Sequence, residues 1–175
     1  MNTPDRSGVA LAQWRKERPD LGDFFPMAVL GRLAEAALVI SRDRLAPLFA
    51  RYGLQAGEFD VLATLRRSGA PYALTPTALY EAAMISSGGM TNRLDRLERE
   101  GLIERRPHPS DRRGSLVALA AKGLALMDEA IGPHLENERA ILAMLSAGEQ
   151  AELYRLLAKL LEGARAPPPV PVSQE

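Results

Sequence analysis

The fold is decided by residues 75–114, which read TPTALYEAAMISSGGMTNRLDRLEREGLIERRPHPSDRRG. Thr75 can cap a helix with its hydroxyl, and Pro76 suits the first helical position because its missing N–H would have no partner there. These two residues predict a helix that begins at Thr75 and runs to about Ala83.

A second helix is expected directly after the short connection at residues 84–87. Apolar residues recur at helical spacing from about Gly88 to Glu100, and Gly101 stands where a glycine in left-handed conformation commonly ends a helix. Two successive short helices joined by a tight connection are typical of a helix-turn-helix.

A β-hairpin follows this pair of helices. Residues 102–106 and 115–119 are short β-compatible runs, and the segment 107–114 between them is rich in turn residues and charge. The order of elements therefore predicts a winged helix-turn-helix, a mainly α fold with a small β-hairpin as its wing.

The apolar periodicity of the remaining chain predicts further helices at residues 9–18, 27–52, 58–67, 121–145 and 148–161. Pro47 should kink or break one of them, and Ser146 with Glu149 forms a capping box for the last. The long apolar faces near both chain ends need a partner surface, so we expect a homodimer whose reading helices lie about 34 Å apart. The expected organisation is an N-terminal extension with one helix (1–26), an all-helical dimerisation lobe (27–56 and 121–163), the winged helix-turn-helix (57–120) and a disordered proline-rich tail (164–175).

The composition is that of an ordinary globular protein. The chain has 175 residues, of which 46% are apolar and 25% charged, with 22 basic residues balancing 22 acidic ones. The lack of cysteine excludes disulfides, zinc ribbons and iron–sulfur clusters. No uncharged apolar run reaches the roughly 18 residues of a membrane span, and residues 1–26 carry no apolar signal segment. A cytoplasmic protein with no membrane attachment is expected.

Catalysis is not expected. His108 in the predicted wing turn and His134 have no Ser/His/Asp arrangement or metal-ligand spacing around them. Ser87-Gly88-Gly89 starts a helix with no strand before it, so it does not predict a phosphate-binding loop. We expect neither a metal nor a cofactor. A helical interaction module without DNA function remains an alternative.

The helix at residues 88–100 is predicted to read DNA. On a helical wheel, Met90, Leu94 and Leu97 lie on one side, and the opposite side carries Gly88, Asn92, Asp95, Arg96 and Arg99. Glycine permits close approach to a duplex, asparagine can read adenine, and arginine can read guanine or hold phosphate. A solvated amphipathic helix with ion pairs would show the same pattern.

The predicted wing supports the DNA reading. Four arginines and one aspartate fall between residues 105 and 113, which places a net charge of +3 on an exposed hairpin. A basic tip beside a helix-turn-helix suits phosphate and minor-groove contact. The predicted DNA contacts are Ser86, Ser87, Gly88, Thr91, Asn92, Arg96, Arg112 and Arg113.

The segments Thr75–Leu79, Ser86–Glu98, Gly101–Arg105 and Asp111–Arg113 resemble those of the multiple antibiotic resistance regulator (MarR) family. The resemblance covers about residues 27–161 and departs from the family pattern at His108 and Ala120. It implies a homodimeric transcription factor, usually a repressor, that binds double-stranded DNA at palindromic operators and is released by a small ligand.

Within that family the sequence is similar to a branch of urate-responsive regulators, which carry an additional N-terminal helix. The branch's ligand-site residues match Trp14, Asp60, Arg93 and Arg105 here. Urate is a planar anion with N–H and C=O groups, which suits guanidinium forks, a carboxylate acceptor and an aromatic stacking face. Because Arg93 belongs to the reading helix, the resemblance implies that a bound ligand moves this helix out of register with the operator half-sites.

Simpler interpretations of the four residues stay open. Helical periodicity alone places Asp60 on the surface, and Arg93 and Arg105 suit ordinary ion pairs with Glu58, Glu98 or Glu104. Trp14 can serve only to anchor the N-terminal helix. The effector can also be another small anion, such as xanthine, an aconitate-type carboxylate or a phenolic acid.

Overall fold

The computed structural model describes residues 6–55, 57–83, 89–110 and 114–166. The chain forms two compact units, Met1–Asn137 and Glu138–Glu175. None of the described helices is both long enough and apolar enough to cross a lipid bilayer.

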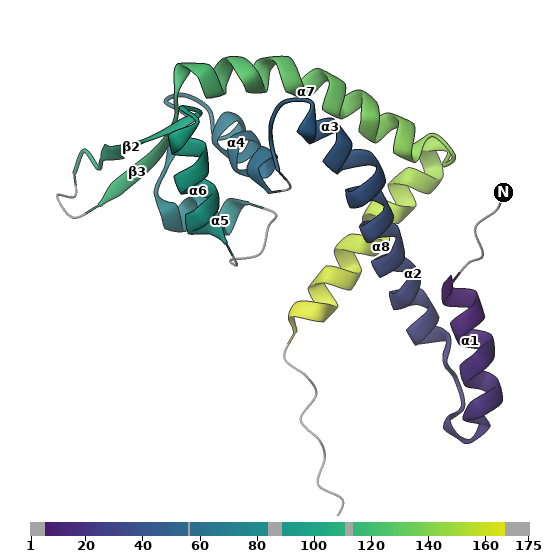
Figure 1. Ribbon diagram of the computed structural model, residues 1–175. Coiled ribbons are helices and arrows are strands. Elements are labelled where there is room, and N and C mark those ends of the chain that lie inside the picture. Colours follow the sequence, from purple (N-terminus) through teal and green to yellow (C-terminus); the bar gives the residue numbers. More distant parts are fainter. Residues whose placement is uncertain (1–5, 56, 84–88, 111–113, 167–175) are drawn as a thin grey trace, which may run out of the picture. The chain divides into compact units, whose positions relative to one another are not determined.

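The chain begins with a helical hairpin of α1 (Arg6–Glu17) and α2 (Phe25–Val39), joined through a 3₁₀ turn, η1 (Pro19–Leu21) (Figure 1). The Ser7 hydroxyl donates to the Ala28 carbonyl over 2.5 Å, and the absence of a side chain on Gly31 leaves room for Ser7. The predicted N-terminal helix is confirmed, with a start three residues earlier than expected.

The predicted long helix at residues 27–52 is interrupted before Pro47. The α2 helix passes into a π-helical stretch, η2 (Ile40–Leu45), and then into α3 (Ala46–Ala50). In the widened turn, the Ala46 N–H donates to the Ser41 carbonyl, five residues back. Pro47 explains the change, because it offers no N–H to the carbonyl four residues before it and its ring crowds that carbonyl.

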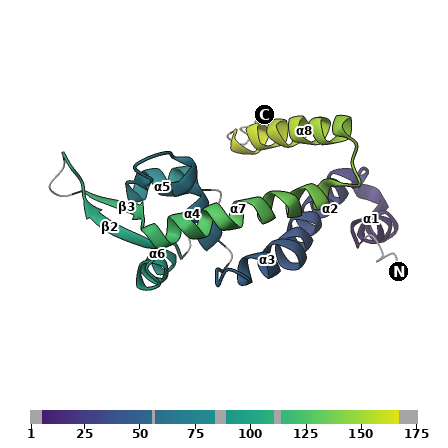
Figure 2. The same cartoon turned by 90° about the horizontal axis from the view of Figure 1, so that it is seen from above.

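The winged helix-turn-helix consists of three helices and a small sheet. Its helices are α4 (Glu58–Arg67), α5 (Pro76–Ala82) and α6 (Met90–Arg99), and its strands are β1 (Ala73–Leu74), β2 (Ile103–Pro107) and β3 (Ser115–Leu119). The sheet is antiparallel in the order β1-β3-β2, with Arg105 opposite Val117. Figures 1 and 2 show the β2–β3 hairpin beside α6.

Local signals set the helix ends in this region. The Thr75 hydroxyl caps α5 by accepting from the Ala78 N–H at 3.1 Å, as the sequence predicted. Gly89 and Gly101 flank α6 with φ angles of +81° and +69°, in the left-handed region that glycine tolerates best. Strand β1 was not predicted, because two residues are too few to show the alternation that marks a strand.

One apolar core holds these elements together. It is formed largely by aliphatic side chains that are almost fully enclosed, among them Leu62, Leu65, Leu79, Leu97, Ile103 and Met127. Helix α7 (Ala121–Leu142) adds Met127 to the core. Its first turn approaches the backbone so closely that a Cβ on Gly123 would lie 2.0 Å from the Leu102 carbonyl oxygen.

Helix α8 (Ala147–Arg165) lies in the second unit. The Ser146 hydroxyl accepts from the Glu149 N–H at 3.3 Å and the Glu149 carboxylate accepts from the Ser146 N–H at 2.8 Å, so the predicted capping box is confirmed. The tail was predicted to begin at residue 164, but α8 continues to Arg165; residues 167–175 lie outside the described part.

Candidate functional site

Helix α6 has the two faces expected of a reading helix. Leu94 and Leu97 are buried against the core, and Thr91, Asn92, Asp95 and Arg99 are exposed. The predicted contacts Thr91 and Asn92 therefore lie on its accessible surface, in the first turn. In helix-turn-helix proteins the N-terminal residues of the second helix reach base edges in the major groove.

Arg96 differs from the prediction. The helical wheel placed it on the exposed face, but its guanidinium turns back toward α4, where Nη1 donates to Glu58 Oε2 and Nη2 donates to the Gly53 carbonyl at 3.0 Å. Glu58 is only 1% exposed, and the same oxygen accepts from the Gln55 N–H at 2.6 Å. A wheel gives the direction of a Cβ, whereas the long arginine side chain can bend toward a buried negative charge.

Arg93 turns inward, toward the start of α4. Its side chain lies against Gly57, the residue that precedes α4, and a Cβ there would stand 2.8 Å from Arg93 Nε. Gly57 also has a φ of +82°, which disfavours any other residue. The Arg93 side chain is half-buried, so this arginine does not simply extend from α6 toward solvent.

Arg105 joins the wing to α6. Alternation along a strand places Ile103 and Arg105 on one face, yet Ile103 is buried and Arg105 is exposed. Its Nη2 donates to Asp95 Oδ1 at 2.6 Å, and its Nη1 donates to Glu98 Oε2. The hydrogen bond to Asp95, reinforced by the charge of Glu98, raises the pKa of the Arg105 guanidinium.

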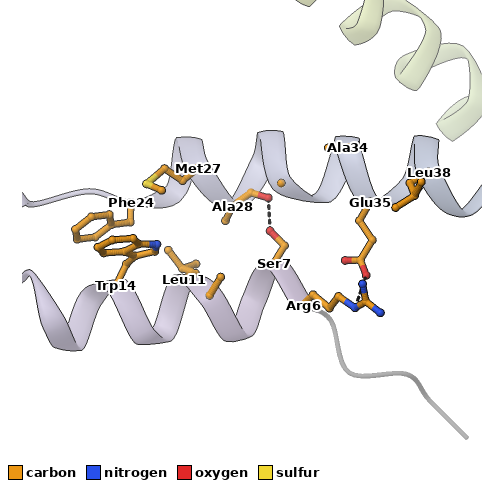
Figure 3. A pocket seen from close by; sticks show the side chains of 12 residues that line it. Arg6, Ser7, Leu11, Trp14, Phe24, Met27, Ala28, Ala34, Glu35 and Leu38 are labelled. Carbon is orange, nitrogen blue, oxygen red and sulfur yellow. Dashed lines mark hydrogen bonds and ion pairs between the residues drawn. The ribbon is translucent and has the colours of Figure 1, made fainter.

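Trp14 belongs to a different part of the structure. Its ring stacks on Phe24 with 6.1 Å between centroids, beside a hollow of about 370 Å³ between α1 and α2 (Figure 3). The lining is mainly apolar, and the Arg6–Glu35 ion pair forms part of it.

Arg93 lines a second hollow, of about 320 Å³, together with Gln55, Glu58, Asn92, Asp95, Arg96 and Arg99. This hollow shares no residue with the Trp14 hollow, and Asp60, which is half-buried on α4, lines neither. Arg105 also lines neither. Within one chain, the four predicted ligand residues are therefore not gathered around either of these hollows.

Five of the predicted DNA contacts, Ser86, Ser87, Gly88, Arg112 and Arg113, lie outside the described residues. The described part of the wing is closed by a hydrogen bond from the His108 N–H to the Gly114 carbonyl at 3.0 Å. Arg106 pairs with Glu104 on the same strand.

Sequence reasoning missed the connecting roles of Glu58 and Gly57 and the contact of Arg105 with Asp95. The ion pair of Arg105 with Glu98, one of the simpler interpretations left open, is present. The sequence indicates Glu58 only as an ordinary ion-pair partner for an arginine. An acidic residue is common in the first turn of a helix because the helix dipole stabilises it there. The available signal was Gly57, since a glycine before a helix marks a place where the backbone is left-handed or another group comes close.

One of the two histidines lies among aromatic side chains. His134 packs on Phe59, with 4.5 Å between ring centroids, and on Phe49 at 5.7 Å. Within the described ranges, no cluster of three or more His, Asp or Glu side chains is arranged to hold a metal ion.

Comparison with known proteins identifies the family. A MarR family model matches residues 52–114. The HTH-type transcriptional regulator PecS of Dickeya dadantii is 47% identical over 148 residues, which cover 85% of this chain and 88% of PecS. The chain belongs to the MarR family. The multiple antibiotic resistance protein MarR of Escherichia coli is 35% identical over 111 residues, covering 62% of this chain and 74% of that protein.

Solved structures agree with this assignment. A cysteine-to-serine mutant of Escherichia coli MarR complexed with operator DNA superposes with a TM-score of 0.68 at 30% identity, covering 80% of this chain and 99% of that one. The protein is thus a MarR-family DNA-binding transcriptional regulator with a winged helix fold, and it is not an enzyme. The alternative of a helical module without DNA function is wrong.

Proposed function

We propose that this MarR-family regulator is a homodimeric repressor that leaves a palindromic operator when it binds urate or a related purine. The observation that carries the proposal is the inward position of Arg93. This arginine belongs to the reading helix α6, yet its guanidinium lies against the start of α4. A ligand that binds Arg93 would therefore act directly on the element that reads DNA.

The ligand chemistry follows from the four residues that the family resemblance assigns to the site, Trp14, Asp60, Arg93 and Arg105, which the proposed dimer would have to bring together. Two guanidinium groups suit the negative charge and carbonyl oxygens of urate, and a carboxylate can accept from its N–H groups. An indole offers a stacking face for the planar ring system. The 47% identity with PecS supports a close functional relationship with that regulator.

The homodimer is supported by apolar side chains that a single chain leaves exposed. Helix α2 carries exposed Val29, Leu30, Leu33 and Leu38, and α8 separately carries exposed Leu153, Tyr154, Leu156, Leu160 and Leu161. Tyr154 is 79% exposed. Large apolar surfaces of this kind mark interaction sites, and a two-fold dimer places two reading heads on a palindrome.

The proposed release mechanism uses ion pairs that already exist. Arg105 of the wing is held by Asp95 and Glu98 of α6. An anionic ligand at Arg105 would compete with these carboxylates and loosen the wing from the reading helix. Its contact with Arg93 would act on α6 directly, because Arg93 is a residue of that helix. Ligand binding then favours a state in which the two helices no longer match the operator half-sites.

We further propose that Thr91 and Asn92 contact base edges, and that the wing arginines Arg112 and Arg113 contact phosphate. Since each phosphate contact contributes about 0.9 to the slope of log affinity against log salt, Arg113→Ala should weaken operator binding and flatten this dependence. A regulator of this kind is expected to act in the cytoplasm, where the DNA it controls lies.

The lone tryptophan provides the direct test of the effector. Trp14 fluorescence and the thermal midpoint are followed while the protein is titrated with urate, xanthine and aconitate. Urate should change the fluorescence and raise the midpoint, because a ligand that binds only the folded state stabilises it. If urate does neither, the purine proposal fails while the family assignment stands.

Asp60→Ala separates the two classes of ligand. A purine needs the carboxylate as an acceptor for its N–H groups, whereas a tricarboxylate or phenolic acid has little use for it. The variant should lose most of its urate affinity; a full response of this variant to aconitate would favour the carboxylate class.

A further inference from the structure

Glu58 and Arg96 form a buried connection between the reading helix and the rest of the DNA-binding domain. We propose that Glu58 is a positioning residue for operator recognition: it holds Arg96 off the duplex and fixes the placement of α6. This inference rests on DNA binding by the MarR family and does not depend on the identity of the effector.

The geometry joins three parts of the chain at one carboxylate oxygen. Glu58 Oε2 accepts from Arg96 Nη1 on α6 and from the Gln55 N–H in the connection before α4. Arg96 Nη2 also donates to the Gly53 carbonyl, at the end of the turn that follows α3. Arg96 thus ties α6 to two points separated from it by 38 and 43 residues in sequence.

Burial makes this connection strong. Glu58 is 1% exposed, and its other oxygen, Oε1, has no hydrogen-bond partner among the described residues. A buried carboxylate that lost its cationic partner would keep an uncompensated charge in an environment of low polarity, which destabilises the folded state. The pair therefore resists separation, and Arg96 is not free to swing toward DNA as an exposed arginine would be.

The salt dependence of DNA binding distinguishes a positioning residue from a DNA contact. A side chain that neutralises a phosphate contributes about 0.9 to the slope of log affinity against log salt, whereas a side chain that only orients the helix contributes nothing to the slope. Misplacing α6 weakens several base contacts together, so affinity should fall by at least about tenfold, the equivalent of 1.4 kcal/mol.

The experiment compares Arg96→Met, Glu58→Gln and the double variant with the parent protein. The probe is a duplex that carries the operator selected from a random-sequence library. Arg99→Met is the matched control, because Arg99 is an exposed arginine on the same helix and its loss removes the same charge. The double variant leaves no charge buried without a partner, so it tests the proposal even if a single variant fails to fold.

Arg96→Met should weaken operator binding at least about tenfold and leave the salt slope at the parent value. Glu58→Gln should release Arg96, steepen the slope by up to about 0.9 and reduce discrimination between operator and random DNA. The double variant should return the slope to the parent value.

Two results would overturn the proposal. One is a salt slope in Arg96→Met that is flatter than in the parent protein by about 0.9, since this marks a phosphate contact. The other is a loss of discrimination confined to a single base pair, since this marks direct reading by Arg96.

Discussion

Gly123 is the position at which one methyl group should do the most damage to the DNA-binding domain. It lies in the first turn of α7, and a Cβ there would stand 2.0 Å from the Leu102 carbonyl oxygen. Ordinary contacts begin at 3.4 Å, so Gly123→Ala requires α7 and the start of β2 to separate by about 1.4 Å. The Leu102 carbonyl also accepts from the Ala120 N–H at 3.1 Å, and this bond would be strained or lost.

The magnitude follows from three terms. Overpacking costs about 1–3 kcal/mol, and the weakened hydrogen bond costs about 0.5–1.5 kcal/mol. Replacing glycine by alanine inside a helix stabilises the helix by about 1 kcal/mol, which offsets part of this cost. The free energy of unfolding should therefore fall by about 2 kcal/mol, which lowers the thermal midpoint by about 4–8 °C in a chain of this size.

The assay is thermal unfolding followed by circular dichroism at one fixed protein concentration, since the proposed dimerisation would make the midpoint depend on concentration. Gly163→Ala in α8 is the control, because a Cβ on Gly163 meets nothing within 4 Å. The control should leave the midpoint unchanged or raise it slightly. Equal midpoints for Gly123→Ala and the control would refute the close packing of α7 on Leu102.

Three further predictions follow from individual contacts. Gly57→Ala should push the Arg93 guanidinium away, since the new Cβ would lie 2.8 Å from its Nε; calorimetric titration should then show weaker urate binding, and unchanged binding would contradict the placement of Arg93. Asp95→Asn should increase urate affinity, because it removes a carboxylate that competes for Arg105; the same titration checks this, and a loss of affinity would refute the competition. Hydrogen bonds in the capping box of α8 lower the pKa of Glu149. The stabilisation they give is therefore present above the ordinary glutamate pKa and is lost as the pH falls through the lowered pKa. Helicity measured by circular dichroism between about pH 6 and pH 2 should decline as Glu149 is protonated, and a flat profile would contradict this role of the capping box.

Much of the fold could be predicted because its signals are local. Thr75 and Pro76 mark the start of α5 through the hydrogen-bonding needs of a first helical turn, and Gly101 marks the end of α6 through its left-handed conformation. The capping residues of α8 act in the same way. Strand β1 carries no such signal, because its pairing with β3 is decided by residues more than forty positions away.

The site was harder to predict because its arginines pair with groups on other secondary-structure elements, which are distant in the sequence or become neighbours only in the fold. Helical periodicity placed the Cβ atoms of Arg93 and Arg96 on α6, but the direction of each guanidinium depends on groups of α4 and the turn before it. Alternation along the strand places Arg105 on the same face as Ile103, yet the Arg105 guanidinium is bound by two acidic residues of α6. No pattern within a single element could show these pairings.

An anion bound near Arg93 is proposed to release the regulator from DNA. Fluorescence anisotropy of a labelled operator duplex, measured at urate concentrations from zero to saturation of the Trp14 signal, tests it most directly. A coupling of about 1–3 kcal/mol predicts that operator affinity falls by about 5- to 150-fold. An operator affinity that stays constant while Trp14 reports full urate occupancy would contradict the account.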